Sequence, residues 1–219
     1  ARILKLKIYL LEPNHVLGRA NKYFLKYCKK IFCYSENVKN LPYNFKEKII
    51  IINPLVRKNI YQSDLSRKTY QNDKFTLLIV GGSQGANLFD KKLKNSIVNI
   101  SKNYQLKIIH QTNKNYISSL RNFYLENNIE NKIFSFDINF LESIKEVDLC
   151  ITRAGASTLA ELSFLNIPFI AVPLPTSRDN HQLENANFYK NKECCWVIEQ
   201  NYFDEKIEEL INYILINTE

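Results

Sequence analysis

The sequence is poor in several residue types: it has no methionine, one tryptophan and only five glycines in 219 residues. The longest apolar run, IPFIAVPL at residues 167–174, contains two prolines. It is well short of the roughly 18 residues that a membrane-spanning helix needs. We therefore expect a buried strand there, and neither a transmembrane helix nor a signal peptide. Because the chain opens on Ala1 and ends at Glu219 just after a helical pattern, we expect an internal piece of a longer protein.

Several catalytic and metal-binding signatures are also missing. The sequence has no Ser/His/Asp order, no H-E-x-x-H motif and no phosphate-loop lysine. His15, His110 and His181 stand apart, and no pair of them has metal-ligand spacing, so we predict no bound metal. The cysteines are odd in number and include no C-x-x-C pair, which predicts free thiols in a reducing cytosol.

The composition that is present indicates a folded protein with an anionic partner. Hydrophobic residues make up 45%, enough for a real core, which argues against disorder. The net charge of +8 suits a nucleotide, a nucleic acid or an acidic membrane face, although lysines spread over solvated surfaces would give the same total. No basic stretch with interleaved aromatics is found, which disfavours nucleic acid.

From residue 75 onward, short apolar strands alternate with helix-like stretches. Such alternation predicts βαβ units and a parallel sheet that is covered on both faces. The predicted strands are 75–80, 106–110, 132–136, 148–151, 169–172 and 195–198. The predicted helices are 86–100, 115–127, 139–146, 158–165, 181–191 and 203–216.

The part before residue 75 predicts the tail of another α/β domain. A strand at 5–11, a helix at 16–27 and a strand at 30–34 fit its pattern, and residues 49–68 lose the apolar periodicity of a regular element. We therefore divide the chain into 1–57, the C-terminal part of a first domain; 58–74, a linker; and 75–219, a Rossmann-like domain.

Ligands of open α/β sheets bind at the carboxyl ends of the strands, so the loops there are the candidate sites. Residues 77–88 read LLIVGGSQGANL, a strand that meets Gly81, Gly82 and Gly85 before a helix. Such a turn lets the backbone approach a phosphate, and Ser83 would add a hydroxyl donor. A purely structural turn remains the alternative.

The second loop, ITRAGASTLAEL at residues 151–162, has two interpretations. The order of Thr158 and Glu161 matches a capping box, in which Glu161 bonds back to the start of a helix beginning at Ser157 or Thr158. Alternatively, Glu161 accepts hydrogen bonds from a ribose diol, because a carboxylate offers two acceptor oxygens, while Ser157, Thr158 and nearby N–H groups meet phosphate.

Two further segments complete the candidate site. Residues 173–187, PLPTSRDNHQLENAN, follow a strand and carry amides suited to sugar hydroxyls, unless they form only a solvated loop. Arg57, in the Asn-Pro-Leu-Val-Arg segment, could reach a pyrophosphate bidentately, although a linker arginine is more often just solvated.

Five motifs together, in this order, resemble the MurG family of bacterial N-acetylglucosaminyltransferases. They are E-x-N-x-x-x-G-x-x-N (12–21), N-P-x-x-R (53–57), GGSQGA (81–86), RAGAST-x-x-E (153–161) and DNHQ-x-x-NA (179–186). The resemblance covers essentially the whole chain. It implies a GT-B fold with two Rossmann-like domains that face a cleft, the first of them only partly present here.

The resemblance also implies an activity and its partners. UDP-GlcNAc would donate GlcNAc, with inversion and without a metal cofactor, to undecaprenyl-pyrophosphoryl-MurNAc-pentapeptide. This step converts lipid I to lipid II in peptidoglycan and cell-wall synthesis, at the cytoplasmic face of the bacterial inner membrane, to which such enzymes bind peripherally. No nucleic acid is implied. The alternatives are a UDP-GlcNAc epimerase, another GT-B lipid glycosyltransferase, or a non-catalytic nucleotide-sugar-binding subunit.

Carried over by position, the family's donor site maps onto residues spread along the chain. Ser83 would contact the nucleotide-sugar, Arg57 the pyrophosphate and Glu161 the ribose. The uracil would meet the backbone after the strand that ends at residue 136, at Asp137 or at Ile138. The predicted donor-binding residues are Asn14, Arg57, Gly82, Ser83, Gln84, Ile138, Ala156, Ser157, Thr158, Leu159, Ala160, Glu161, Gln182 and Asn185.

The catalytic base has only one candidate in this sequence, Glu12. The family's own candidate, a histidine near the N-terminal glycine-rich loop, has no counterpart in these residues. We therefore expect this piece to retain most of the donor site, and to be inactive as a transferase by itself.

Overall fold

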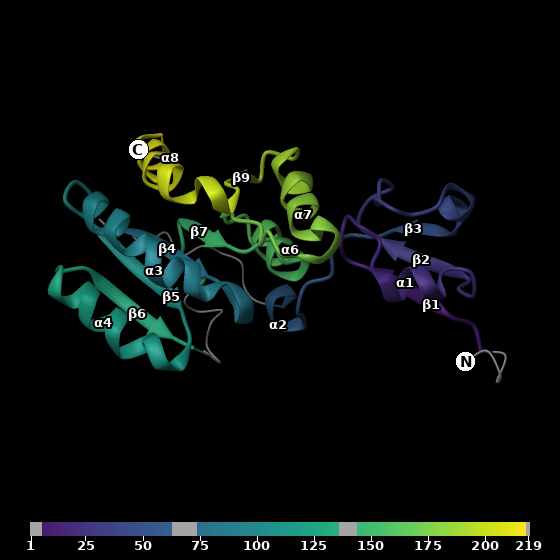
Figure 1. Ribbon diagram of the computed structural model, residues 1–219, viewed down its shortest axis with the longest axis horizontal. Helices are drawn as coiled ribbons and strands as arrows, with labels where there is room; N and C mark the ends of the chain where they lie inside the picture. The colour runs from purple at the N-terminus through teal and green to yellow at the C-terminus, as the bar shows by residue number, and fades with distance from the viewer. Residues whose placement is uncertain (1–5, 63–73, 136–143, 218–219) are drawn as a thin grey trace.

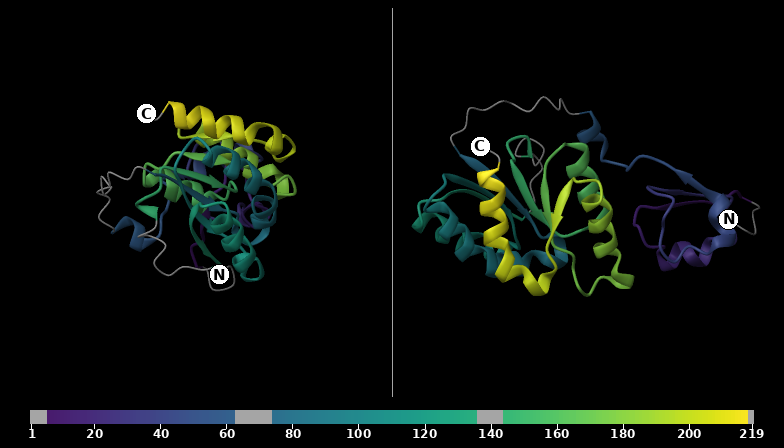
Figure 2. Two further views of the ribbon diagram at one scale, coloured as in Figure 1. Left: turned by 90° about the vertical axis from the view of Figure 1, so that its left-hand side faces the viewer. Right: turned by 90° about the horizontal axis from the view of Figure 1, so that it is seen from above.

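The computed structural model describes residues 6–62, 74–135 and 144–217, without the side chains of residues 83–86. The chain forms two parallel sheets with helices, at opposite ends of an elongated arrangement (Figure 1). The N-terminal strands form the smaller sheet, and all strands from β4 onward form the larger one (Figure 2).

The smaller sheet has three parallel strands in the order β1-β2-β3: β1 (Tyr9–Glu12), β2 (Lys30–Cys33) and β3 (Ile49–Ile51). Helix α1 (Arg19–Phe24) and the 3-10 helix η1 (Tyr43–Lys48) accompany them. A cluster that includes Leu17, Leu25, Ile31 and Cys33 fills the space against one face.

Three predictions for this part were wrong in their limits. The strand predicted at 5–11 is β1, which begins only at Tyr9. The helix predicted at 16–27 begins only at Arg19, because Val16 is extended and forms a bridge with Lys39, while Leu17 is buried. Residues 49–68, in which we expected no regular element, include β3, which pairs with β2 through Ile31 and Ile49. Three residues are too few to show a periodicity in the sequence, so only the pairing reveals this strand.

A short helix, α2 (Lys58–Tyr61), follows in the segment predicted as linker. Ile60 is fully buried, and the ring of Tyr61 lies 5.9 Å from that of Phe164. These contacts hold the end of the connecting segment against the larger part of the molecule, next to α6.

The larger sheet has six parallel strands in the order β6-β5-β4-β7-β8-β9. All six predicted strands are present: β4 has its predicted limits, and the ends of the others differ by at most two residues. Their bounds are β4 (Phe75–Val80), β5 (Leu106–Gln111), β6 (Glu130–Phe134), β7 (Leu149–Thr152), β8 (Phe169–Ala171) and β9 (Cys195–Val197).

Helices cover both faces of this sheet, as the continuous apolar strands predicted. On one face lie α3 (Gly82–Ser101), α4 (Ile117–Glu126) and α8 (Phe203–Ile216). On the other face lie α6 (Ala156–Phe164) and α7 (His181–Lys190). Short 3-10 helices precede three of them: η2 (Lys114–Tyr116), η3 (Arg178–Asn180) and η4 (Gln200–Tyr202). The predicted helix at 139–146 falls mostly outside the described residues.

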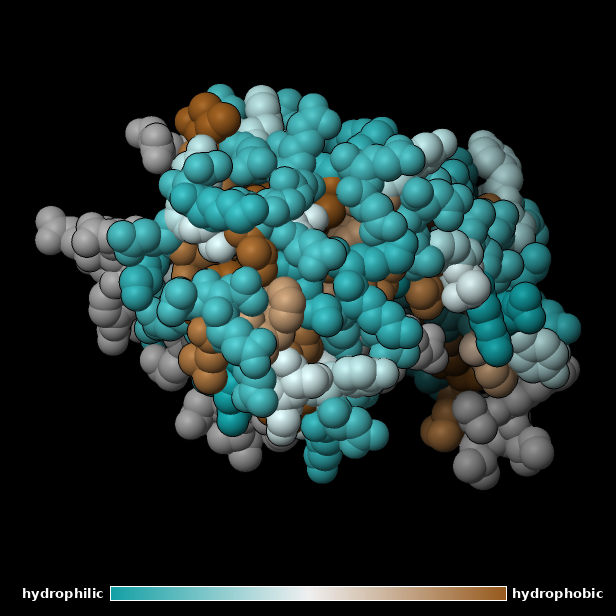
Figure 3. Space-filling view, turned by 60° about the vertical axis from the view of Figure 1, so that its left-hand side comes forward, coloured by the Kyte–Doolittle hydropathy of each residue, from teal (hydrophilic) through white to brown (hydrophobic). Residues whose placement is uncertain are grey.

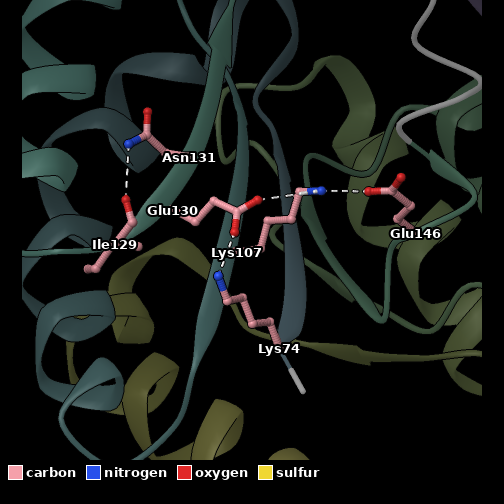
Figure 4. Close-up of polar contacts among 6 residues, drawn as sticks. All are labelled: Lys74, Lys107, Ile129, Glu130, Asn131 and Glu146. Carbon is pink, nitrogen blue, oxygen red and sulfur yellow. Dashed lines mark hydrogen bonds and ion pairs between the residues drawn. The ribbon is translucent and has the colours of Figure 1, made fainter. Parts of the chain in front are cut away.

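An ionic cluster ties together the amino ends of three strands (Figure 4). Lys107 Nζ lies 2.6 Å from a carboxylate oxygen of Glu146 and 3.7 Å from one of Glu130, and Lys74 donates to Glu130 at 2.8 Å. These hydrogen bonds raise the pKa of Lys107 and lower that of Glu130. The cluster lies at the end of the sheet opposite to the glycine-containing loops.

All five cysteines are free thiols, as predicted. In the described parts of the chain, no helix is long and apolar enough to cross a membrane. The face of the molecule in Figure 3 is predominantly hydrophilic, with hydrophobic atoms only in small interrupted groups.

Candidate functional site

The strand order of the larger sheet creates a crevice between β4 and β7. From β4 the chain builds outward through β5 and β6, then returns to place β7 on the other side of β4. Ligands of such sheets bind where the order reverses, at the carboxyl ends of the strands. Four of the five glycines lie at the two strand-to-helix junctions that flank this point: Gly81, Gly82 and Gly85 at the start of α3, and Gly155 just before α6.

The loop after β4 contains a backbone conformation that requires glycine. Gly82 has φ of +63°, in the left-handed region that side chains disfavour. Helix α3 begins there, and no side chain of a described residue caps its first N–H groups. The roles predicted for Ser83 and Gln84 concern side chains outside those the structure describes.

The loop after β7 corrects the capping-box prediction. Helix α6 begins at Ala156, with Gly155 as its N-cap, so it starts earlier than Thr158 and lacks a side-chain cap from the described residues. Glu161 lies in the second turn, too far along the helix to bond back to its start, and it bonds to Arg57 instead. The uncapped N-terminus leaves N–H groups and a positive helix dipole at the crevice.

Arg57 and Glu161 form a bidentate ion pair. Arg57 Nε donates to Glu161 Oε1 at 2.7 Å, and Nη2 donates to Oε2 at 2.8 Å. The Glu161 side chain is 11% exposed and that of Arg57 58%, so the carboxylate is the desolvated partner. The hydrogen bonds raise the pKa of Arg57 above its ordinary value. The sequence predicted different ligand groups for these two residues, and the structure brings them into direct contact.

A cavity of about 580 Å³ opens beside this ion pair. Its volume is in the range typical of small-molecule sites. Residues from the connecting segment, the strand ends and α6 form its wall: Leu55, Val56, Arg57, Leu78, Val80, Gly82, Gln111, Phe134, Ile144, Cys150, Ser157, Thr158, Glu161 and Leu162.

The cavity unites part of the predicted donor site. Five predicted residues line it, namely Arg57, Gly82, Ser157, Thr158 and Glu161. Leu159 and Ala160 are instead buried in the protein interior, because they point to the opposite side of α6. Ala156 is the first residue of α6 and is not part of the cavity wall. Asp137 and Ile138 lie outside the described residues.

Sequence reasoning missed Gln111 as a site residue, although it noted strand β5. Gln111 ends that strand two positions after the buried Ile109, on the side of the sheet that faces the cavity. The signal available in the sequence was a polar residue at the end of a strand, on the same face of that strand as the apolar Ile109.

Two further predicted residues, Asn14 and Asn185, meet at the junction of the two sheets. Asn185, on α7, is fully buried. Its Oδ1 accepts from the backbone N–H of His15 at 3.0 Å, and its Nδ2 donates to Asn14 Oδ1 at 3.1 Å and to the carbonyl of Ala154 at 3.2 Å. Asn185 therefore connects the turn after β1 with the turn after β7. On the same helix, Gln182 Oε1 accepts from the backbone N–H of Leu174.

Glu12 is 1% exposed, and N–H groups surround its carboxylate. The backbone N–H and Nδ2 of Asn14 donate to Oε1, while the Gly18 N–H donates to Oε2 at 2.7 Å and Asn21 Nδ2 at 2.9 Å. A side chain on Gly18 would place a Cβ 3.1 Å from Oε2, which explains the glycine there. Because four donors bond to its carboxylate, Glu12 stabilises this turn. A catalytic base, in contrast, needs an oxygen that is free to accept the proton of the attacking hydroxyl.

Replacing Glu12 with glutamine tests these two roles. We expect a loss of about 1–3 kcal/mol of stability, because the amide turns one N–H donor toward groups that are themselves donors. Thermal or urea unfolding measures this. A catalytic base would give the opposite pattern, with unchanged stability and a large loss of transfer rate in the full-length enzyme.

His15 makes the junction sensitive to acid. Its ring stacks on Phe188 at 3.8 Å, and burial, with a smaller contribution from Lys192, lowers its pKa to about 4. Because the pKa of His15 in the folded state is below the ordinary value near 6.5, its contribution to stability is fully present above about pH 6.5. This contribution is lost as the pH falls toward 4. We expect unfolding curves to show this loss, and a His15→Phe variant to lose less stability over the same interval.

Comparison with known protein families identifies this arrangement. Residues 76–219, the six-stranded sheet with its helices, match the Glycosyltransferase family 28 C-terminal domain. The chain belongs to glycosyltransferase family 28. The matched region contains the whole wall of the cavity except the residues of the connecting segment.

Relatives confirm the resemblance to MurG within this family. A protein of Pelagibacter ubique named UDP-N-acetylglucosamine–N-acetylmuramyl-(pentapeptide) pyrophosphoryl-undecaprenol N-acetylglucosamine transferase is 50% identical over 216 residues. The match covers 98% of this chain and 60% of that protein. A protein of the same name from Rickettsia canadensis is 40% identical, with 63% of its length covered. The chain thus spans about three-fifths of the length of these relatives.

Solved structures confirm the predicted GT-B type of α/β fold. The Acinetobacter baumannii MurG structure aligns over 97% of this chain with a TM-score of 0.77 and 24% identity. The structure of Neisseria meningitidis UDP-GlcNAc 2-epimerase bound to UDP-GlcNAc aligns over 89% with a TM-score of 0.58 and 14% identity. At these identities the likeness concerns the fold alone.

Proposed function

We propose that the protein transfers GlcNAc with inversion from UDP-GlcNAc to the lipid-linked acceptor undecaprenyl-pyrophosphoryl-MurNAc-pentapeptide, which forms lipid II in peptidoglycan synthesis. This chain contributes mainly the half that binds the donor. The main supporting observation is the cavity at the β4–β7 crevice, where Arg57 and Glu161 meet two helix N-termini that no side chain of a described residue caps. The names of the relatives at 50% and 40% identity support the choice of substrates.

The groups around the cavity suit the parts of a nucleotide-sugar. The starts of α3 and α6 present N–H groups and positive dipole ends, which favour a diphosphate. Glu161 offers two acceptor oxygens for a ribose diol, once the ligand replaces Arg57 as its partner. Arg57 is half-exposed and free to turn toward the diphosphate.

Transfer with inversion is an in-line displacement. A base takes the proton from the attacking hydroxyl while UDP leaves from the opposite face of the sugar. The growing negative charge on the leaving diphosphate needs fixed donors and cations, and the two helix starts and Arg57 supply them. We propose that this stabilisation serves in place of a metal. Asn14 and Asn185 meet at the junction of the sheets, and Gln182 lies on the same helix as Asn185; we assign these three residues to the sugar.

Calorimetry with UDP-GlcNAc and ADP-glucose tests the donor assignment. We expect binding of the uridine ligand and none, or far weaker binding, of the adenosine ligand. Equal binding, or none of either, would overturn the proposal. Transfer to a lipid I analogue tests the reaction itself, and the isolated residues 1–219 are expected to bind donor without measurable turnover.

We further propose that the protein works peripherally at the cytoplasmic face of the bacterial membrane, with the smaller sheet toward the lipid. Residues 1–61 contain 13 lysines and arginines against three acidic residues, whereas residues 74–219 contain 15 against 17. Exposed aromatic side chains accompany this charge, including Tyr23 at 64% and Tyr43 at 84% exposure. Lys26 lies 5.9 Å from the Tyr23 ring, and Lys46 lies 5.3 Å from that of Tyr43. Cations beside amphipathic rings favour an anionic interface.

Co-sedimentation with vesicles tests this orientation. Binding is expected to phosphatidylglycerol-containing vesicles and to weaken with salt, and a double Lys26→Glu and Lys46→Glu variant should lose it. The control is a Lys91→Glu and Lys206→Glu variant, which removes the same charge from the helices of the larger sheet. Equal loss in both variants would contradict the assigned surface.

A further inference from the structure

A network of buried polar side chains lies between α3, α4 and the end of β5. It consists of Asp90 on α3, His110 on β5, Thr112 just after β5 and Tyr124 on α4, each at most 4% exposed. Thr112 Oγ1 donates to Asp90 Oδ2 at 2.8 Å, and His110 Nε2 lies 3.1 Å from Asp90 Oδ1. The Asp90 carboxylate therefore joins the helix to the strand through both of its oxygens.

The two contacts of Asp90 differ in kind. The bond from Thr112 is a hydrogen bond of ordinary length. The contact with His110 is close but is not aligned as a hydrogen bond, so it is an electrostatic contact in the protein interior. His110 Nδ1 lies 3.3 Å from the Tyr124 hydroxyl, whose pKa burial raises, so that hydroxyl keeps its proton and can donate it to Nδ1. This arrangement leaves the ring N–H on Nε2, on the side of Asp90.

Stability alone does not explain a carboxylate at this position. Neighbouring inward-facing positions of α3 are apolar, with Phe89, Leu93 and Ile97 fully buried. Taking a carboxylate out of water is costly, and apolar side chains in place of buried charged groups are often as stable or more so. Apolar contacts are also non-directional, whereas a hydrogen bond requires a defined direction. Asp90 is therefore suited to fix how α3 is rotated on the sheet.

Both ends of the network lead to the wall of the cavity. Asp90 lies about two turns from Gly82, the residue of the wall at which α3 begins. Thr112 directly follows Gln111 of the wall, and its backbone N–H donates at 2.8 Å to the carbonyl of Phe134, which also lines the cavity. The network thus links the helix start that is proposed to bind the diphosphate to the ends of β5 and β6.

We propose that Asp90 is a positioning residue for donor binding: its contacts with Thr112 and His110 fix the rotation of α3 against β5, and with it the direction in which the first N–H groups of α3 point at the diphosphate. The inference rests on the proposed function, because it takes the ligand to be a nucleoside diphosphate. It adds to that function a residue outside the cavity wall, which acts on the ligand through the helix.

The test compares a ligand with and without the diphosphate. Calorimetry gives the affinity of the protein for UDP, and competition against UDP gives that for uridine. We expect Asp90→Leu, similar in volume, to weaken UDP binding about tenfold and to change uridine binding by less than about twofold. Thr112→Val removes only the hydroxyl and should lower the ratio of the two affinities in the same direction. Asp90→Asn keeps an acceptor for Thr112 and should restore the ratio to within about twofold of that of the unmodified protein.

The control is Asp204→Leu, which removes an exposed acidic contact of α3, the ion pair of Asp204 on α8 with Lys92. It should leave the ratio unchanged. An unchanged ratio in Asp90→Leu, including an equal loss of both ligands, would overturn the inference, and so would a ratio that Asp90→Asn does not restore. Should Asp90→Leu fail to fold, the ratio in Thr112→Val decides in the same way. Failure of the unmodified protein to bind UDP would instead contradict the proposed function, so the two failures are distinguishable.

Discussion

Replacing Glu161 with alanine is expected to weaken UDP binding about 10- to 100-fold and to leave thermal stability almost unchanged. The loss of affinity follows because alanine removes both acceptors for the ribose hydroxyls. Stability changes little because Arg57, already 58% exposed, returns to water once its partner is gone. Calorimetry with UDP and a thermal melt measure the two effects on the same sample.

The reciprocal variant should behave differently. Arg57→Ala leaves the Glu161 carboxylate largely buried and without the partner that occupies both its oxygens, so we expect a loss of about 1–3 kcal/mol of stability as well as weaker donor binding. The control is Glu130→Ala, which removes another ion-paired glutamate at the opposite end of the sheet. Unchanged UDP affinity in Glu161→Ala would show that the carboxylate serves only to hold Arg57.

Replacing Asn185 with leucine is expected to loosen the junction between the two sheets. Leucine has a similar volume but leaves the His15 N–H, the Ala154 carbonyl and Asn14 Oδ1 without their present partner. We expect a loss of about 2–3 kcal/mol of stability from these buried groups. Hydrogen exchange should become faster at the turn after β1 and in β1, while the amides of β4 remain protected.

The matched control is Asn187→Leu on the same helix, because the Asn187 side chain has no hydrogen bond to a described residue. It should change stability by less than about 0.5 kcal/mol. Urea unfolding, followed by the single tryptophan, Trp196 in β9, gives the stability of the larger sheet. Equal effects of the two variants would mean that the Asn185 carboxamide does not hold the junction.

The sequence determined the larger sheet well because its central strands, such as β4, β7 and β8, are buried on both faces. Continuous apolar runs of four to six residues between helix-like stretches need no tertiary knowledge to be recognised, and β4 was predicted at its observed limits. The same logic failed for β3, since Ile49–Ile51 is short and partly exposed. Its identity as a strand comes from pairing with β2, a contact between distant parts of the chain.

The sequence also placed the candidate site at the two glycine-containing loops, and tertiary structure changed the meaning of individual residues. The spacing of Thr158 and Glu161 fits a capping box, but α6 starts at Ala156 and Arg57 takes both carboxylate oxygens. A partner 104 residues away cannot be inferred from spacing along a helix.

Taken by itself, the sequence determined the α/β class, the six strands, the loops at the crevice and the resemblance to MurG, because these depend on local composition and order. Only the tertiary structure decided which polar groups meet, namely Arg57 with Glu161 and Asn185 with the turn after β1. It also placed Gln111 in the wall of the cavity. Side-chain partners are set by strand order and by the docking of the two sheets. Those long-range constraints position groups that are separated by up to 171 residues in the chain.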